Sequence, residues 1–211
     1  MPAFSFDPTS GRYRNASGKL VSQAHIRGAL DSVLRAQAVE ARNLTAMLGD
    51  GILSLGDWER LMMANIKATH LVSATTANGG WASMTQADFG WVGQRIRTQY
   101  DYLRGFASDI ATGKQALTAS AQARAELYAE AGRQTHRAAE TRQARKRGAD
   151  QERNVLGVAD HCAGCLRENA QGWVPIGDLV PCGARQCRVR CHCHLVYRRK
   201  PILQTGRQKA A

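Results

Sequence analysis

The sequence predicts a mainly α protein with a helical body, an extended N-terminal arm and a small cysteine-rich module near the C-terminus. Three observations lead to this prediction. Apolar residues recur at three- and four-residue steps over much of the chain, with glycines between the repeats. Alanine is frequent and aromatic residues make up only 6% of the 211 residues, which disfavours a sheet-dominated core. All six cysteines lie in one segment, residues 161–197.

These patterns divide the chain into four parts. We expect an arm at residues 1–19, a body of about four helices at 20–150, the cysteine module at 151–200 and a basic tail at 201–211. No stretch approaches 18 consecutive apolar residues, so the sequence predicts no membrane span.

The arm combines structure-breaking residues with spaced aromatic side chains, Phe4, Phe6 and Tyr13. It has too little apolar surface for a core of its own. We therefore expect it to be mobile or to lie along another surface. The alternation of Phe4 and Phe6 would also suit a strand added to a partner.

The first two helices of the body are marked by apolar periodicity and by their ends. The first covers residues 21–48 and stops at Gly49–Gly51. The second starts near Ser54, whose side chain can cap the helix together with Asp57, and it stops at Gly79–Gly80.

The third helix opens at Thr85, a typical N-cap residue, and ends at Gly113. Its apolar residues fall on one seam. Trp91, Tyr100 and Tyr102 lie off that seam. They either widen the core or face a neighbouring subunit.

The fourth helix, residues 118–147, has a different composition. Its apolar residues are mostly alanine, with Leu127 and Tyr128 as the only large ones, and arginines accumulate from Arg133 onward. Because so little apolar surface cannot stabilise an isolated helix, we expect it to pack through its first alanines. Beyond them it would continue as a charged linker.

The cysteines follow the spacing C-x2-C, then sixteen residues, then C-x4-C-x3-C-x-C. Two close groups of thiols separated by a linker can surround one tetrahedral ion, with neighbouring thiolates about 4 Å apart. Sulfur-rich, four-coordinate sites select zinc. The module is therefore predicted to bind one structural Zn²⁺.

The alternatives are a disulfide framework, scattered reduced thiols and an iron–sulfur cluster. The first residues contain no apolar signal sequence, since Phe6 is followed at once by Asp7 and Pro8. We therefore expect a reducing compartment, where clustered cysteines favour a metal over disulfides.

The first knuckle of the site is the pair Cys162 and Cys165, and the second half must supply two more thiols. Cys182 lies in a turn between Pro181 and Gly183 and is the weakest candidate. The predicted ligands are drawn from Cys162, Cys165, Cys187, Cys191 and Cys193. His161 and His192 adjoin cysteines and are either substitute ligands or outer neighbours of the site.

The formal charge of +12 and the pI near 10.0 indicate an acidic partner, either nucleic acid or an acidic protein. The chain contains no Asp or Glu from Arg185 onward. This end is either a solvated tail or a segment that contacts phosphates, with Arg198, Arg199 and Lys200 at its centre.

Catalysis is not predicted. Phosphate-binding glycine loops, nucleophile elbows and zinc-protease helices do not occur in the sequence. His161 and Cys162 also lack the glutamate and proline of the zinc deaminase pattern. Four thiolates would close the coordination sphere and leave no position for an activated water.

The order of cysteines resembles that of tailed-phage head morphogenesis proteins, the minor head proteins similar to the F protein of phage Mu. The resemblance covers His161 to Cys165, the loop Gly172 to Gly177 and the end from Cys187 to Tyr197, about a fifth of the chain. This sequence departs from that family at Arg188, where the family often has histidine, and in the additional Cys182.

The resemblance implies a structural protein of a phage head, made in the host cytoplasm and assembled into the virion near the portal vertex. Its implied partners are portal or major capsid protein, with packaged DNA close by, in an oligomeric particle. The alternative is a zinc-containing regulator that binds nucleic acid. Glycines and a proline between residues 166 and 178 exclude a long recognition helix after the knuckle, which disfavours this alternative.

Overall fold

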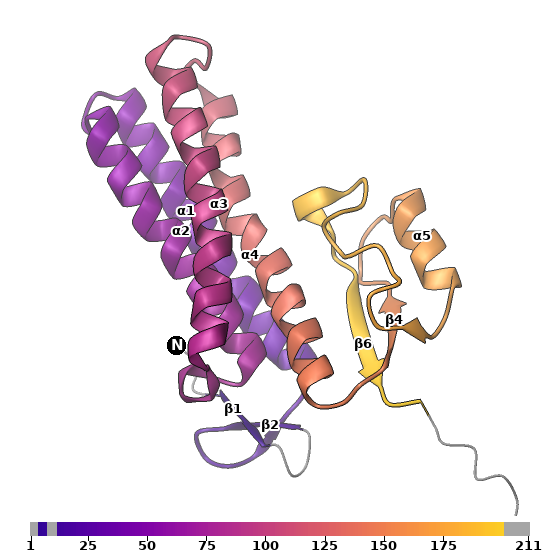
Figure 1. Ribbon diagram of the computed structural model, residues 1–211. Helices are drawn as coiled ribbons and strands as arrows, with labels where there is room; N and C mark the ends of the chain where they lie inside the picture. The colour runs from indigo at the N-terminus through magenta and orange to yellow at the C-terminus, as the bar shows by residue number, and fades with distance from the viewer. Residues whose placement is uncertain (1–3, 8–11, 201–211) are drawn as a thin grey trace, which may run out of the picture. The chain divides into compact units, whose positions relative to one another are not determined.

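The structure is a computed structural model that describes residues 4–7 and 12–200. It is mainly helical, as predicted (Figure 1). The chain divides into two compact units between Glu140 and Thr141, inside the fourth helix. The sequence-based boundary at residue 150 lies ten residues further on, because the last turns of this helix belong to the second unit.

Four long helices form the body of the first unit. They are α1 (Gln23–Gly49), α2 (Leu55–Asn78), α3 (Gln86–Ala111) and α4 (Ala119–Lys146), and a short 3-10 turn, η1 (Trp81–Ser83), precedes α3. All three predicted glycine breaks separate them. Together they cover more than two-thirds of residues 21–147, which confirms the prediction of about four helices.

The predicted N-caps of α2 and α3 are present. The Ser54 hydroxyl accepts the backbone N–H of Asp57 at 3.1 Å. Thr85 and Asp88 form a full capping box, in which each side chain accepts the other residue's backbone N–H. These bonds satisfy N–H groups that the first helical turn leaves without partners.

The largest core cluster lies between α1, α2, α3 and α4. Trp58 and Phe106 meet edge to face, with ring centroids 5.2 Å apart, and both are fully buried. Tyr100 packs against this cluster and donates its hydroxyl proton to the Met63 carbonyl oxygen at 3.1 Å. Trp91 packs against a neighbouring cluster, so only Tyr102, 61% exposed, lies outside the core.

Helix α4 packs through its alanines, as expected. Ala121, Ala125 and Ala129 are fully buried, and Tyr128 stacks on Phe106. Burial extends further than the sequence indicates, because Thr135, His136 and Ala139 are also buried. The Arg133 guanidinium pairs with Asp31 of α1 at 2.8 Å. The expected charged linker is therefore packed helix over most of its length.

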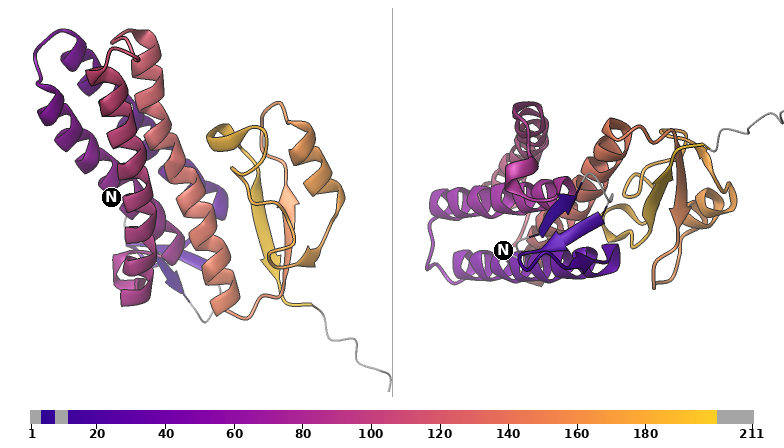
Figure 2. Two further views of the ribbon diagram at one scale, coloured as in Figure 1. Left: turned by 45° about the horizontal axis from the view of Figure 1, so that its top comes forward. Right: turned by 90° about the horizontal axis from the view of Figure 1, so that it is seen from below.

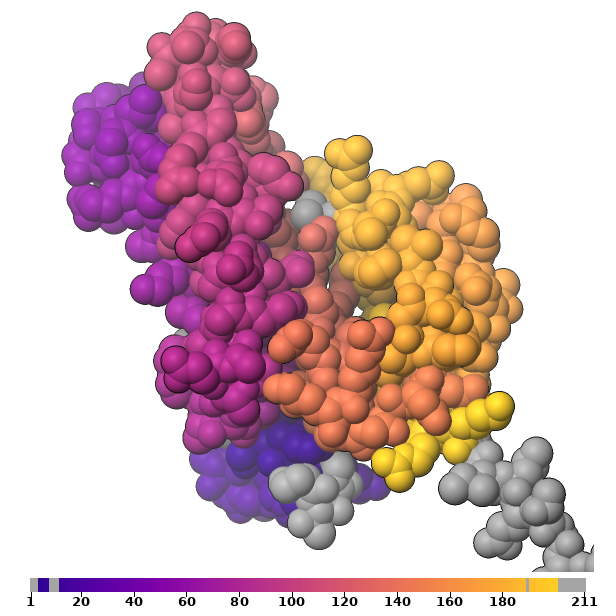
Figure 3. Space-filling model, viewed as in Figure 1, coloured from indigo at the N-terminus to yellow at the C-terminus, as the bar shows by residue number. Residues whose placement is uncertain are grey.

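The described part of the N-terminal arm lies along another surface, the helical body, which was one of the two expectations for it. It does so as a small sheet and not as a single extended segment. β1 (Phe4–Asp7), β2 (Arg12–Asn15) and β3 (Leu20–Val21) form an antiparallel sheet in the order β1-β2-β3. The sheet lies across one end of the helices (Figures 1 and 2). In the space-filling view its described residues form a continuous surface with the base of the body (Figure 3).

Two contacts hold this sheet on α2. The Tyr13 side chain is buried, and its hydroxyl donates to the Ala77 carbonyl oxygen at 2.9 Å. The Phe6 backbone N–H donates to the Gly79 carbonyl oxygen at 3.2 Å. Gly79 has a φ of 83°, and a Cβ there would lie 2.2 Å from the Phe6 Cβ, so only glycine permits both the turn and the contact.

The second unit is a small α+β module. Its elements are β4 (Gln151–Val155), α5 (Ala163–Ala170), β5 (Val174–Pro175), the 3-10 turn η2 (Arg188–Arg190) and β6 (His194–Arg198). The sheet order is β5-β4-β6, with both pairs antiparallel. The basic tail at 201–211 lies outside the described residues. Across the described chain, every helix is too short or too polar to cross a membrane.

Candidate metal centre

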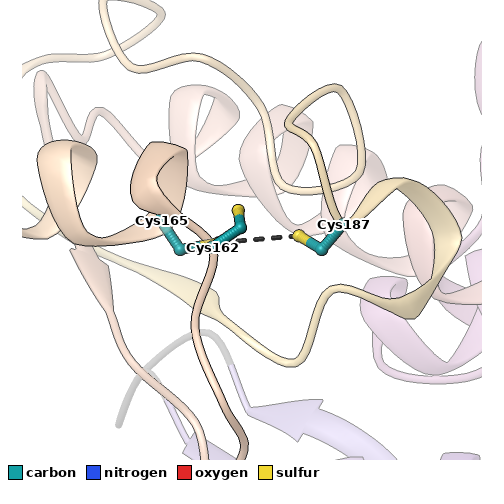
Figure 4. A group of neighbouring side chains, drawn as sticks. All are labelled: Cys162, Cys165 and Cys187. Carbon is teal, nitrogen blue, oxygen red and sulfur yellow. Dashed lines mark hydrogen bonds between the residues drawn. The ribbon is translucent and has the colours of Figure 1, made fainter.

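The first knuckle lies at the start of α5. Cys162 is the N-cap residue, and Cys165 falls in the first turn, where the Leu166 N–H donates to the Cys162 carbonyl oxygen at 3.2 Å. A C-x2-C pair at a helix start brings both sulfurs to the same side of the turn. Figure 4 shows them facing Cys187 from the opposite loop.

The second half of the centre is the loop around η2. Cys187 precedes the 3-10 turn, Cys191 follows it, and Cys193 leads into β6. Arg188 has a φ of 46°, a left-handed conformation that is unfavourable for a residue with a side chain. This bend folds the loop so tightly that Cys187 and Cys191 both approach Cys165.

The thiols converge in two overlapping groups. The sulfurs of Cys162, Cys165 and Cys187 all lie within 4.8 Å of one another, and so do those of Cys165, Cys191 and Cys193. The Cys165 sulfur is 3.6 Å from that of Cys187 and 3.9 Å from that of Cys191. The structure therefore brings all five predicted ligands together around Cys165.

These distances suit a tetrahedral thiolate site. With metal–sulfur bonds of about 2.3 Å, tetrahedral geometry places the sulfurs about 3.8 Å apart. Cys165, Cys191 and Cys193 are almost fully buried, while Cys162 and Cys187 are half-buried. The cluster can hold a metal ion shielded from water, which is the arrangement of a structural site.

The environment of the thiols links metal binding to proton release. Burial raises the pKa of the Cys165 thiol, and burial raises the pKa of Cys187 to about 11. The backbone N–H of Cys165 lowers the pKa of Cys162 to about 7. Because a metal binds thiolates, most of these thiols must lose a proton as the ion enters, so affinity falls at low pH.

Cys182 and the histidines differ in their relation to the cluster. Cys182 belongs to neither group, and its sulfur is 3.7 Å from the Asn154 side-chain oxygen. His192 is exposed. The His161 Nε2 lies 2.9 Å from the Gly157 carbonyl oxygen, which can only accept, so Nε2 carries the proton. Its Nδ1 is then a lone-pair donor, 3.7 Å from the Cys193 sulfur.

Arg185 was expected to belong to the exposed basic end of the chain, and its position beside the thiols was not predicted from the sequence. The side chain is only 5% exposed, and its Nη1 lies 2.8 Å from the Asn154 Oδ1 and 3.8 Å from the Cys165 sulfur. Burial opposes its charge, but the Cys182 and Cys165 sulfurs beside it, in their thiolate form, outweigh burial and raise its pKa. The cluster supplies its counter-charge once the thiols have lost their protons, which explains an arginine two residues before Cys187.

Two buried carboxylates hold the loop that carries the second half of the centre. A Glu152 oxygen accepts the backbone N–H groups of Gly177 and Leu179, at 2.9 and 3.2 Å. A Glu168 oxygen accepts the Val180 N–H at 3.0 Å. These bonds connect β4 and α5 to the loop between β5 and η2, so the cysteines are positioned by the sheet and the helix together.

The chain was compared with protein-family models, with curated proteins and with solved structures, and none of these comparisons found a match.

Proposed function

We propose that the chain is a structural, non-enzymatic protein of a tailed-phage head whose C-terminal module is stapled by one Zn²⁺. The observation that carries the proposal is the convergence of five thiols in a small module with little other core. Its buried apolar cluster consists of Leu179, Leu195 and four cysteines, three of which belong to the converging thiols. A module of this size needs a metal or disulfides for stability, and disulfides do not occur among the cysteines.

Zinc is the ion that the donor set favours. The donors are cysteine sulfurs, their spacing suits tetrahedral coordination, and zinc needs no redox partner. When bound, the ion would supply folding free energy to the module rather than an activated water. Cys162, Cys165, Cys187 and Cys191 would hold it, with Cys193 and the His161 Nδ1 next to them.

The role in a phage head rests on the cysteine order that resembles minor head proteins, and on the basic charge of the module. The short α5, eight residues long, does not provide the long recognition helix expected of a sequence-specific regulator. The N-terminal strands fold on α2 and Tyr100 packs against the core of the body, so neither feature supports a contact with a neighbouring protein.

The proposal is tested in two independent steps. Particles purified from cells that carry the encoding genome should contain the chain as a stoichiometric head component; its absence from them would overturn the structural role. Metal analysis of the purified protein should give about one zinc per chain, as four-thiolate sites do. Cys162→Ser should lose the zinc, whereas Cys182→Ser, outside both thiol groups, should keep it.

A further inference from the structure

One face of the β5-β4-β6 sheet is buried and the other is partly exposed. Directly opposed residues of antiparallel strands share a face. Glu152 and Asn154 of β4 are buried on the side of the cysteine cluster, together with Leu195. The alternate residues of the strands form the other side, which we name the open face. Its exposed members include Arg153 and Arg198.

Arg198 on the open face is held in one position. Its Nε donates to the Gln151 side-chain oxygen at 2.8 Å, and Gln151 is its opposite residue in the sheet. The guanidinium carbon lies 4.2 Å from the centre of the Trp173 ring. Within the described residues its two Nη groups make no hydrogen bond. A fixed guanidinium with both Nη groups available suits two parallel bonds to a phosphate.

The charge of this unit is strongly positive. Residues 141–211 carry 14 Lys and Arg against five Asp and Glu, so they hold +9 of the total charge of +12. The carboxylates of Glu152 and Glu168 are buried and accept backbone N–H groups. An Asp150 oxygen accepts the Lys200 N–H at 2.6 Å. Five carboxylates cannot balance 14 cations, so this unit keeps a net positive charge.

We propose that the open face binds the phosphodiester backbone of nucleic acid, with Arg198 as a bidentate phosphate ligand and Arg153 as a second contact. Trp173 is a positioning residue, since it holds the guanidinium of Arg198 without contacting the phosphate. The inference deepens the proposed function by identifying the surface that would lie against packaged DNA. It rests on that function only in taking DNA as the nucleic acid.

The test measures binding of the zinc-loaded, full-length chain to a labelled duplex DNA by fluorescence anisotropy at several salt concentrations. Arg198→Gln should weaken binding about tenfold, the value of one charge-assisted contact, and reduce the salt slope by about one. Trp173→Leu should weaken binding but leave the slope unchanged, because every charge remains. Unchanged metal content and circular dichroism would confirm that both changes leave the fold intact.

The matched control is Arg97→Gln, which removes an equal charge from the exposed side of α3. It should change affinity less than twofold. An effect equal to that of Arg198→Gln would overturn the proposal in favour of diffuse attraction, and so would tighter binding to polyglutamate than to DNA. A single-stranded probe that depends on Arg198 in the same way supports it. If the chain bound no DNA at all, this inference would be overturned but the proposed function would not. The presence of the chain in phage particles is measured in a separate experiment.

Discussion

At the scale of single residues, the helical body buries polar side chains that apolar periodicity does not predict to be in the core. His70 of α2 is 1% exposed, and its Nδ1 lies 2.7 Å from the Thr135 hydroxyl oxygen of α4. That oxygen also accepts the Nε–H of Arg95 from α3 at 3.0 Å. The bonds join three helices through one hydroxyl, and protonation of His70 would place a second cation beside Arg95.

This arrangement predicts a loss of stability in acid. Burial, aided by the charge of Arg95, lowers the pKa of His70 from 6.5 to about 4. The unfolded chain therefore binds a proton that the folded chain excludes between these values, and the free energy of unfolding falls as pH drops from 6.5 toward 4. The slope from this residue is about 1.4 kcal/mol per pH unit.

The measurement is urea unfolding, followed by the helical circular dichroism signal, at pH 7 and pH 5. The parent protein should lose free energy of unfolding between pH 7 and pH 5, and His70→Gln should make this loss about 2 kcal/mol smaller. The control is His25→Gln, which changes an exposed histidine of α1. It should leave the decrease in the free energy of unfolding between the two pH values unaltered. An identical pH dependence in the His70 variant would show that this histidine does not exclude its proton.

At the scale of elements, α4 is the helix whose packing depends on small side chains. Its alanines and Gly132 let it approach α1 and α2 closely. A Cβ at Gly132 would lie 2.7 Å from the Leu34 Cδ2 and 2.8 Å from both the Ser73 Oγ and the Thr69 Cγ2. These neighbours are fully buried, so they have little room to move.

Two glycine-to-alanine changes should therefore have opposite effects. Gly132→Ala should destabilise the body by about 1–3 kcal/mol through overpacking. Gly93→Ala should stabilise it by up to about 1 kcal/mol, because α3 is exposed there and no atom lies within 4 Å of the added Cβ. Urea unfolding at neutral pH measures both. Equal effects of the two changes would contradict the close contact of α4.

At the scale of the whole molecule, the two units have separate cores. That of the first consists of apolar side chains from four helices, and that of the second consists largely of cysteines. Removal of a metal should lower the stability of the second unit but not that of the first, because only the second core contains the thiols.

A strong zinc chelator at neutral pH should unfold the second unit and leave the first intact. We expect rapid proteolysis within residues 151–200 but only a small decrease in helical circular dichroism, because α5 is the one full helix of that segment. The same chelator saturated with zinc is the control. A single cooperative loss of all helical signal would mean that the two units fold as one.

The sequence alone determined the features that depend on nearby residues. The four helices follow from apolar periodicity, their ends from glycines and from caps such as Ser54 and Thr85, and the metal-binding segment from cysteine spacing. The last of these is a candidate metal site, since its cysteines could hold an ion. Each is a local relation, and local geometry is similar in any fold.

Only the tertiary structure decided the features that join distant residues. Tyr13 reaches Ala77 across 64 positions, which turns the expected arm into a folded sheet. Arg185 and Asn154 meet beside the thiols across 31 positions, which converts an expected surface arginine into a buried charge partner. Whether a side chain is buried, and which charge faces it, depends on segments brought together by folding, and neither can be read from spacing along the chain.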